Sequence, residues 1–230
     1  MPRSLASIIG SPDFIPDSRF ESLAERTLSE FFHARSAVPG PLTTDALTTL
    51  VDKHADDLDV YADLSKHGDA EGVTHYKPGA RPKVFIVAAL AEARNDHRFR
   101  TTLAHELGHV LVHGPMFDAK VAQDPLPFGE SAHHVCRRDG IESPEREARI
   151  EWQAWALGMA LLMPMSGVRP LVNSLCEQFG KFGEIHHEST FGDLLSGAVS
   201  ETFRVSTVAA RIRLVRCGVL VKHVPVATLF

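Results

Sequence analysis

Apolar residues recur at every third or fourth position near the start of the chain, which is the spacing of one helix face. They do so over residues 19–34, after an irregular leader of residues 1–18 that is interrupted by prolines. A second helix is expected from a cap at Thr43 or Thr44 to about His54. We expect both helices to pack against the core and not to carry chemistry.

Between residues 57 and 87 the pattern changes to short extended pieces separated by turn residues. The pieces cover residues 58–64, 72–76 and 83–87. They predict a small sheet that precedes the next helix.

A third helical pattern covers residues 98–113, which read RFRTTLAHELGHVLVH. On a helix, His105 and His109 leave the same face one turn apart, so their imidazoles can bind one metal ion. Glu106 stands beside the pair, where a carboxylate can take a proton from an attacking water without binding the metal itself. The spacing is therefore that of a zinc hydrolase.

The bare HExxH pattern is only suggestive in a chain with 13 histidines, and the alternative is a structural helix whose histidines are hydrogen-bonded. The setting of the motif favours a metal site. Leucines and valines give the helix a buried side, and Gly108 allows another backbone to approach closely. We expect Gly114 and Pro115 to end this helix.

A long connection over residues 114–144 is expected to be a loop, because glycine and proline recur along it. Within it, His133, His134 and Cys136 suggest a second metal site. We expect no such site, because no partner cysteine lies nearby in the sequence.

The next strong helix is expected over residues 145–163, entered through Ser143 and Pro144 and followed by another proline. Its two tryptophans, Trp152 and Trp155, are interpreted as packing residues. One stripe of this helix carries two carboxylates and two small residues, namely Glu147, Glu151, Ala154 and Gly158.

The small residues of this stripe would let a second helix come close, as a ligand donated across to the histidine pair requires. We therefore choose Glu151 as the third metal ligand. Gln153 cannot point the same way, because residues two apart do not share a helix face. The alternative is that Glu151 is a solvated or salt-bridged residue and that Glu147 is the ligand.

Three helices are expected in the C-terminal region, at residues 171–179, 193–202 and 206–216. The last two and the turn between them make a helix-turn-helix-like unit. The loop before that unit contains His186 and His187, which we interpret as a solvated pair.

The end of the chain is basic, because no Asp or Glu follows Glu201. Its cations are Arg204, Arg211, Arg213, Arg216 and Lys222. DNA contact would require them on the exposed face of the second helix of the unit. Alternatively, the unit packs on the preceding domain or docks a protein substrate, and the arginines only solvate its surface. DNA binding is possible, but we favour the second interpretation.

The composition of the 230 residues, with 44% hydrophobic and 23% charged residues, is that of a globular protein. A net charge of -5 argues against general coating of nucleic acid. No apolar run approaches the roughly 20 residues that span a bilayer, and no signal peptide is expected. The three cysteines form no CxxC pair, which indicates free thiols and a cytoplasmic protein.

A family resemblance extends over residues 83–165. The run FRTTLAHELGHVLVHG, followed later by IEWQAWALGMALLMP, resembles the ImmA/IrrE metallopeptidases, which share an FTLAHELGH-like helix and a later helix ending in LLMP. The resemblance implies an α+β fold. A mainly helical zincin core of the gluzincin type, with a small sheet, would occupy residues 1–168, and a helix-turn-helix-like subdomain would occupy residues 169–230.

The resemblance also implies the roles of the site residues. His105 and His109 would bind zinc, Glu106 would be the general base, and a glutamate on the LLMP helix would be the third ligand. Many family members have that glutamate at the position of Gln153. Members resembling the IrrE branch have it two residues earlier, at Glu151.

Members of this family are typically intracellular regulators that cleave a helix-turn-helix repressor. The resemblance therefore implies a zinc-dependent endopeptidase of narrow specificity, with about one zinc ion per chain, that triggers a stress or mobile-element response. The alternative is a regulator that docks DNA or protein and uses the peptidase scaffold without catalysis. A deformylase-like enzyme would need a ligand cysteine before the metal helix, whereas all three cysteines follow it.

Two points stay open at this stage. Manganese, iron or cobalt could occupy the same ligands as zinc. A donor to the developing oxyanion is also expected, and Tyr61, His75, Tyr76 and the histidines of residues 114–144 are all candidates.

Overall fold

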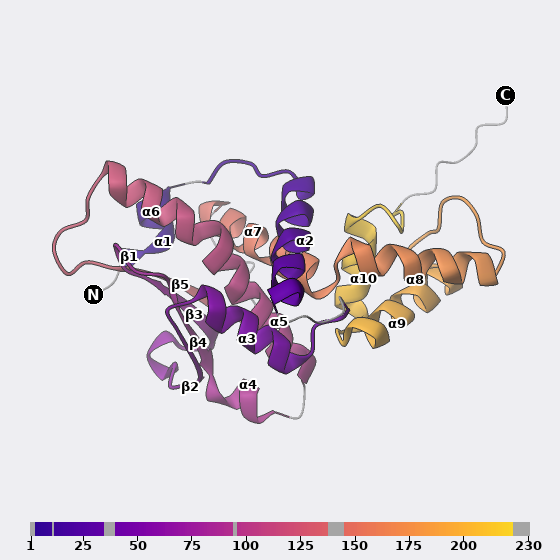
Figure 1. Cartoon of the computed structure of the whole chain (residues 1–230), viewed down its shortest axis with the longest axis horizontal. Helices are drawn as coiled ribbons and strands as arrows, with labels where there is room; N and C mark the ends of the chain where they lie inside the picture. The colour runs from indigo at the N-terminus through magenta and orange to yellow at the C-terminus, as the bar shows by residue number, and fades with distance from the viewer. Residues whose placement is uncertain (1–2, 11, 35–39, 94–95, 138–144, 223–230) are drawn as a thin grey trace.

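Short extended segments give the chain one small mixed sheet, against which helices pack (Figure 1). Its strands are β1 (Arg3–Ser4), β2 (Asp57–Ala62), β3 (Ala70–Tyr76), β4 (Lys83–Val87) and β5 (Ala132–Arg137). They lie in the order β1-β5-β3-β4-β2, with β3 antiparallel to both neighbours. The computed structural model describes residues 3–10, 12–34, 40–93, 96–137 and 145–222.

Helices make up most of the rest of the described chain. The α-helices are α1 (Leu5–Ile9), α2 (Asp17–Ala34), α3 (Thr44–His54), α4 (Ala88–Glu92), α5 (Asp96–Gly108), α6 (Gly114–Gln123), α7 (Glu145–Leu162), α8 (Met165–Gln178), α9 (Thr190–Phe203) and α10 (Thr207–Arg216). A 3-10 turn, η1, covers Ser65–His67, and a π-helical segment, η2, covers His109–His113 between α5 and α6. The fold is therefore α+β, as predicted.

The sheet separates two apolar layers, because successive side chains of a strand face opposite ways. Val84 and Ile86 of β4 belong to the main core together with Leu103 and Leu107 of α5. A smaller cluster around Val73 lies apart from that core.

The first half of the sequence predicts these elements well. The helices α2 and α3 and the strands β2, β3 and β4 lie within two residues or so of their expected bounds. The Thr43 hydroxyl accepts the expected cap bond from Ala46 N at 3.1 Å.

Three sequence expectations are wrong. The leader of residues 1–18 contains β1 and α1, which are held by tertiary packing: Leu5 and Ile8 bury themselves against Tyr76 and Phe117. The expected loop of residues 114–144 contains α6 and β5. Gly114 and Pro115 do not end the preceding helix, because Pro115 stands in the first turn of α6, where no backbone N–H is needed.

The C-terminal helices α8 to α10 gather at one end of the molecule, beside α2 and α7 (Figure 1). Buried Arg100 of α5 reaches the last carbonyls of α9, donating to Phe203 O at 3.1 Å and to Arg204 O at 3.2 Å. These carbonyls have no partner within the helix, so a cation there is stabilising. The helix that carries His105 is thereby fastened directly to α9.

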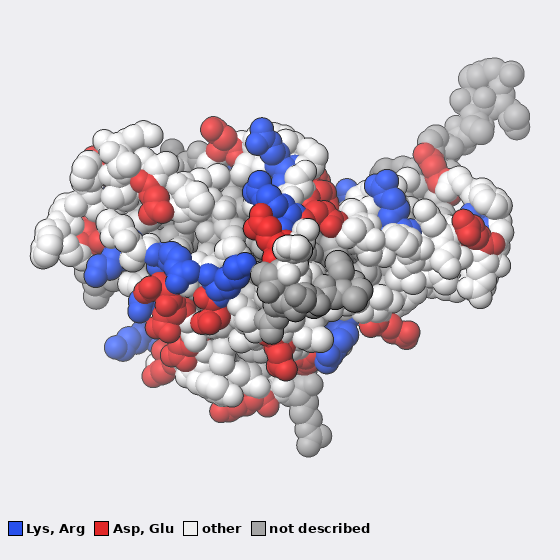
Figure 2. Space-filling model, in the orientation of Figure 1, with Lys and Arg blue, Asp and Glu red and all other residues white. Residues whose placement is uncertain are grey.

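Buried Arg213 of α10 makes the second fastening. It pairs with both carboxylate oxygens of Glu21 on α2 and donates to Met163 O after α7. Arg204, Arg211 and Arg216 also pair with carboxylates, those of Asp96, Asp193 and Asp17 respectively. On the face drawn in Figure 2, acidic and basic side chains are interspersed over this end of the molecule. The C-terminal arginines thus have partners inside the protein.

No single helix of the described residues is both long enough and apolar enough to cross a membrane. Among pairs of helices in the described residues, only α7 with α8 is, and these two are bent by 61° relative to each other.

Candidate metal centre

The end of α5 and the start of η2 bring the two predicted histidines together. His105 and His109 are fully buried, and their Nε2 atoms lie 3.0 Å apart. The expectation that both rings leave one helix face is confirmed. Trp155 of α7 packs against the imidazole of His105, and the centroids of the two rings are 4.7 Å apart. Trp155 is therefore a packing residue, as expected, but it packs on the site itself.

Glu151 of α7 completes the group. Its Oε2 lies 3.3 Å from His105 Nε2, and its Oε1 lies 3.3 Å from His109 Nε2. The three ligand atoms lie within 4.8 Å of one another and could hold a metal ion. The side chain of Glu147, the alternative ligand, lies outside the described residues, as do Ser143 and Pro144.

Small residues allow the two helices to come this close. A Cβ added to Gly108 would lie 2.4 Å from Ala154 O, and one added to Gly158 would lie 2.9 Å from Ala104 O. Real Cβ atoms do not approach other atoms at the first of these distances, so the glycine is required at that crossing. The stripe of small residues on α7 therefore packs against the metal helix, as predicted.

Burial and neighbouring charges shift the pKa values of the three side chains in different directions. Burial lowers the pKa of His109 well below its ordinary value, and His134 acts in the same direction. Burial alone would raise the pKa of Glu151, but the surrounding histidines, His105 first, hold it well below the ordinary range. Burial alone would lower the pKa of His105, but Cys136 and Glu151 outweigh burial and raise this pKa well above its ordinary value, so a bound metal ion would replace a proton on His105. Imidazole nitrogens and a carboxylate oxygen are the donors that zinc takes, so the residues fit such an ion.

Glu106 points toward the sheet beside this group. It is fully buried, its Oε2 accepts a hydrogen bond from the Thr74 hydroxyl at 2.5 Å, and its Oε1 has no hydrogen-bond partner among the described residues. Gly72 of β3 makes the necessary space, because a Cβ there would lie 2.3 Å from Glu106 Oε1. Burial raises the pKa of Glu106 to about 7, although His105 and the Thr74 hydroxyl act in the opposite direction.

The strand β5 supplies neighbours that sequence reasoning assigned to a loop. The His134 ring stacks on that of His109 at a centroid distance of 4.3 Å, and its Nε2 contacts Glu151 Oε1. Cys136 lies in a second group of possible ligands with His105 and Glu106. Strand alternation over residues 132–136 could have placed these two side chains on one face and His133 on the other.

Sequence reasoning also missed two buried side chains, His113 and Gln153, that lie behind His109. Buried His113 lies one turn after His109, and the two Nδ1 atoms are 3.0 Å apart. Its Nε2 lies 3.1 Å from Oε1 of buried Gln153. The repeated spacing of four residues between His105, His109 and His113 was the signal for this third histidine.

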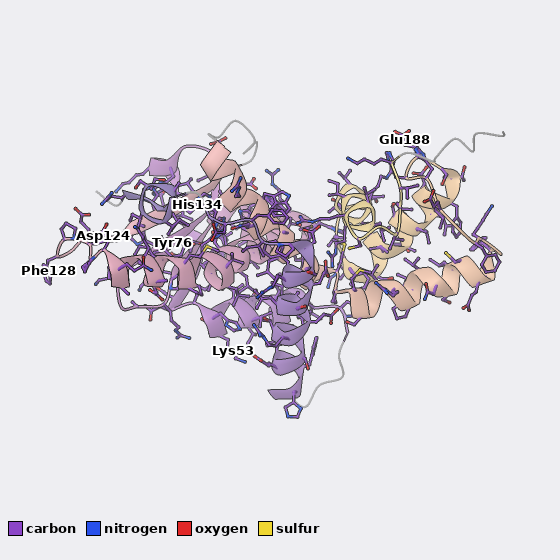
Figure 3. All side chains as sticks on the ribbon, turned by 90° about the horizontal axis from the view of Figure 1, so that it is seen from above. Lys53, Tyr76, Asp124, Phe128, His134 and Glu188 are labelled. Carbon is purple, nitrogen blue, oxygen red and sulfur yellow. The ribbon has the colours of Figure 1, made fainter. Side chains whose placement is uncertain are left out.

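The other candidates for the donor to the oxyanion lie away from the site or already make a hydrogen bond. Tyr61 is 67% exposed on β2, and His75 and His133 are cross-strand partners on the face of the sheet opposite Thr74. The Tyr76 hydroxyl donates to His109 O at 3.3 Å, so it holds the backbone of a possible metal ligand. Figure 3 places His134 and Tyr76 in the part that holds the sheet.

The pair His186 and His187 lies far from this centre, next to Glu188 at the other end of the molecule (Figure 3). His186 Nε2 is 2.8 Å from Lys222 O, so one ring of the pair has a structural partner.

Comparison of the sequence with protein-family models and with curated proteins finds no match.

Proposed function

We propose that the protein is a zinc-dependent endopeptidase whose centre is formed by His105, His109, Glu151 and Glu106. The observation that carries the proposal is the buried carboxylate of Glu106, which stands beside a group of possible metal ligands with one oxygen free of any described partner. Burying such a group without a partner is unfavourable, so a functional reason for it is expected.

Zinc bound by His105, His109 and Glu151 would polarise a peptide carbonyl and lower the pKa of water toward about 7. Glu106 would take the proton of the attacking water and pass it to the leaving amine. Burial raises the pKa of Glu106 to about 7 in the metal-free protein, and a zinc ion bound nearby would favour the ionised form that accepts a proton. The Thr74 hydroxyl holds one carboxylate oxygen, and the other, which lies against Gly72 without a described partner, would take the proton.

The substrate follows from the family resemblance alone and stays a prediction: a helix-turn-helix repressor cleaved at a limited number of sites. The alternative function, a DNA-binding regulator, has less support. It requires cations on the C-terminal helices that are free to bind phosphates, whereas Arg204, Arg211, Arg213 and Arg216 pair with carboxylates of this chain.

The proposal is tested without knowing the substrate. Zinc-loaded protein is incubated with a peptide library prepared from a whole proteome, and new N-termini are counted by mass spectrometry. Wild type and the control Glu201→Gln, which alters an exposed carboxylate on α9, are expected to produce the same cleavages. Glu106→Gln should retain zinc and lose them. Cleavage that survives in Glu106→Gln would remove that residue from the mechanism.

A further inference from the structure

We propose that His113 and Gln153 are positioning residues that fix the tautomer of His109, so that its Nε2 presents a lone pair to the metal. The inference rests on the proposed metal centre and extends it to residues that touch neither metal nor substrate. It follows from a chain of hydrogen bonds in which each group can play only one part.

This series of hydrogen bonds begins at the backbone carbonyl of Asp13. Gln153 Nε2 lies 2.8 Å from Asp13 O. A carbonyl oxygen only accepts hydrogen bonds, so the amide nitrogen of Gln153 must face it and the amide oxygen must face the other way. The N-terminal segment before α2 therefore sets the orientation of a fully buried side chain on α7.

The Gln153 amide then decides the tautomer of His113. Its Oε1, 3.1 Å from His113 Nε2, can only accept, so this nitrogen carries the hydrogen. His113 is fully buried, and its two ring nitrogens contact an amide oxygen and another imidazole but no carboxylate, so its neutral form is favoured. A neutral imidazole has one N–H, and the Nδ1 atom of His113 is consequently an acceptor.

His113 in turn decides the tautomer of His109. The two Nδ1 atoms are 3.0 Å apart, so His109 Nδ1 must be the donor between them. The lone pair of His109 then lies on Nε2, the atom that is 3.0 Å from His105 Nε2 and 3.3 Å from Glu151 Oε1. An imidazole lone pair and a carboxylate oxygen at that distance repel unless a cation lies near both.

The backbone makes possible this relay, the series of hydrogen bonds that runs from Asp13 through Gln153 and His113 to His109. His109 and His113 are the first and last residues of the π-helical segment η2, and their ring centroids are 5.0 Å apart. A π-helical segment inside a helix is uncommon and is often found at functional sites. Outer partners that orient a metal-binding histidine typically change metal affinity by roughly 10- to 100-fold when they are removed.

The first test is made on the metal-free wild type. Nitrogen-15 NMR of labelled histidines reports the tautomer of each ring, and His113→Asn identifies the His113 signals. We expect His113 as the Nε2–H tautomer and His109 as the Nδ1–H tautomer. The reverse pair of tautomers would overturn the inference. This readout needs neither zinc nor peptidase activity.

The second test is zinc affinity, measured by competition with a chromophoric chelator. His113→Leu removes the acceptor for His109 and should weaken zinc binding roughly 10- to 100-fold. His113→Asn places an amide oxygen near the position of Nδ1 and should recover most of that loss. Leu161→Ala, a buried cavity-forming variant on α7, controls for lost packing and should leave the affinity unchanged. Equal affinities in wild type and His113→Leu would contradict the proposal.

These outcomes separate the relay from the proposed function. A wild type with the expected tautomers that binds no zinc would overturn the metalloenzyme and leave the relay as a structural network. A wild type that binds zinc and cleaves peptides, with His113→Leu unchanged in affinity, would overturn only the relay.

Discussion

Gly108 of α5 lies against the backbone of Ala154 on α7, so closely that a Cβ on the glycine would stand 2.4 Å from the alanine carbonyl oxygen. This crossing sits between His109, the next residue on one helix, and Glu151, one turn earlier on the other. The distance between the two helices therefore sets the distance from the histidine pair to the carboxylate.

Substitution of this glycine is expected to open the site. Gly108→Ala should push the helices apart, cost about 1–3 kcal/mol of unfolding free energy, and weaken zinc binding at least as much as the loss of an outer partner. Gly197→Ala on α9 is the matched control, because a Cβ there meets nothing within 4 Å. It should be neutral or slightly stabilising. Chelator competition and thermal unfolding measure both effects, and unaltered zinc affinity in Gly108→Ala would refute the relationship.

Local patterns were enough to predict the components of the site that depend on one helix at a time. The spacing of His105 and His109 and the small residues beside Glu151 are properties of single helices, and the structure brings all three side chains together. The same patterns predict the first helices and strands, since each has a clear period and turn residues at its ends.

What could not be predicted depends on contacts between distant segments. His134 reaches the site because β5 pairs with β3, and a six-residue strand inside a Gly- and Pro-rich stretch carries little signal of its own. Gln153 was rejected as a ligand because it points away from the stripe of Glu151. That direction is the one that places it against His113 and Asp13.

The buried carboxylate of Glu106 is expected to make stability depend on pH. Its pKa is about 7 in the folded protein against an ordinary value of 4.5, so the folded state holds a proton that the unfolded state releases. Stability is therefore lost as the pH rises through this window, and the cost is absent below it. In metal-free protein, Glu106→Gln should raise the unfolding free energy by about 3 kcal/mol at pH 8 and by under about 1 kcal/mol at pH 5.

Urea unfolding of the metal-free proteins at the two pH values measures this effect. Glu201→Gln, on the exposed face of α9, should change the free energy by less than about 0.5 kcal/mol at either pH. A stabilisation by Glu106→Gln of equal size at pH 5 and pH 8 would show that the carboxylate is not titrating in this window.

The buried guanidinium of Arg213 is expected to hold the C-terminal helices in place. Arg213→Ala leaves the Glu21 carboxylate and the Met163 carbonyl without their partner, and should cost about 3–5 kcal/mol of unfolding free energy. Arg211→Ala removes an exposed pair with Asp193 and should cost less than about 1 kcal/mol. Thermal and urea unfolding compare them. Equal losses of unfolding free energy in the two variants would mean that the burial of Arg213 adds nothing to stability.

The metal content of the protein tests the central claim most directly. Protein purified without chelators and supplied with zinc is dialysed and analysed by mass spectrometry, with Glu151→Ala treated in parallel. The wild type is expected to hold about one zinc ion per chain, and Glu151→Ala sharply less. A wild type that holds no zinc, or a variant that holds as much as the wild type, would contradict the metal centre formed by His105, His109 and Glu151.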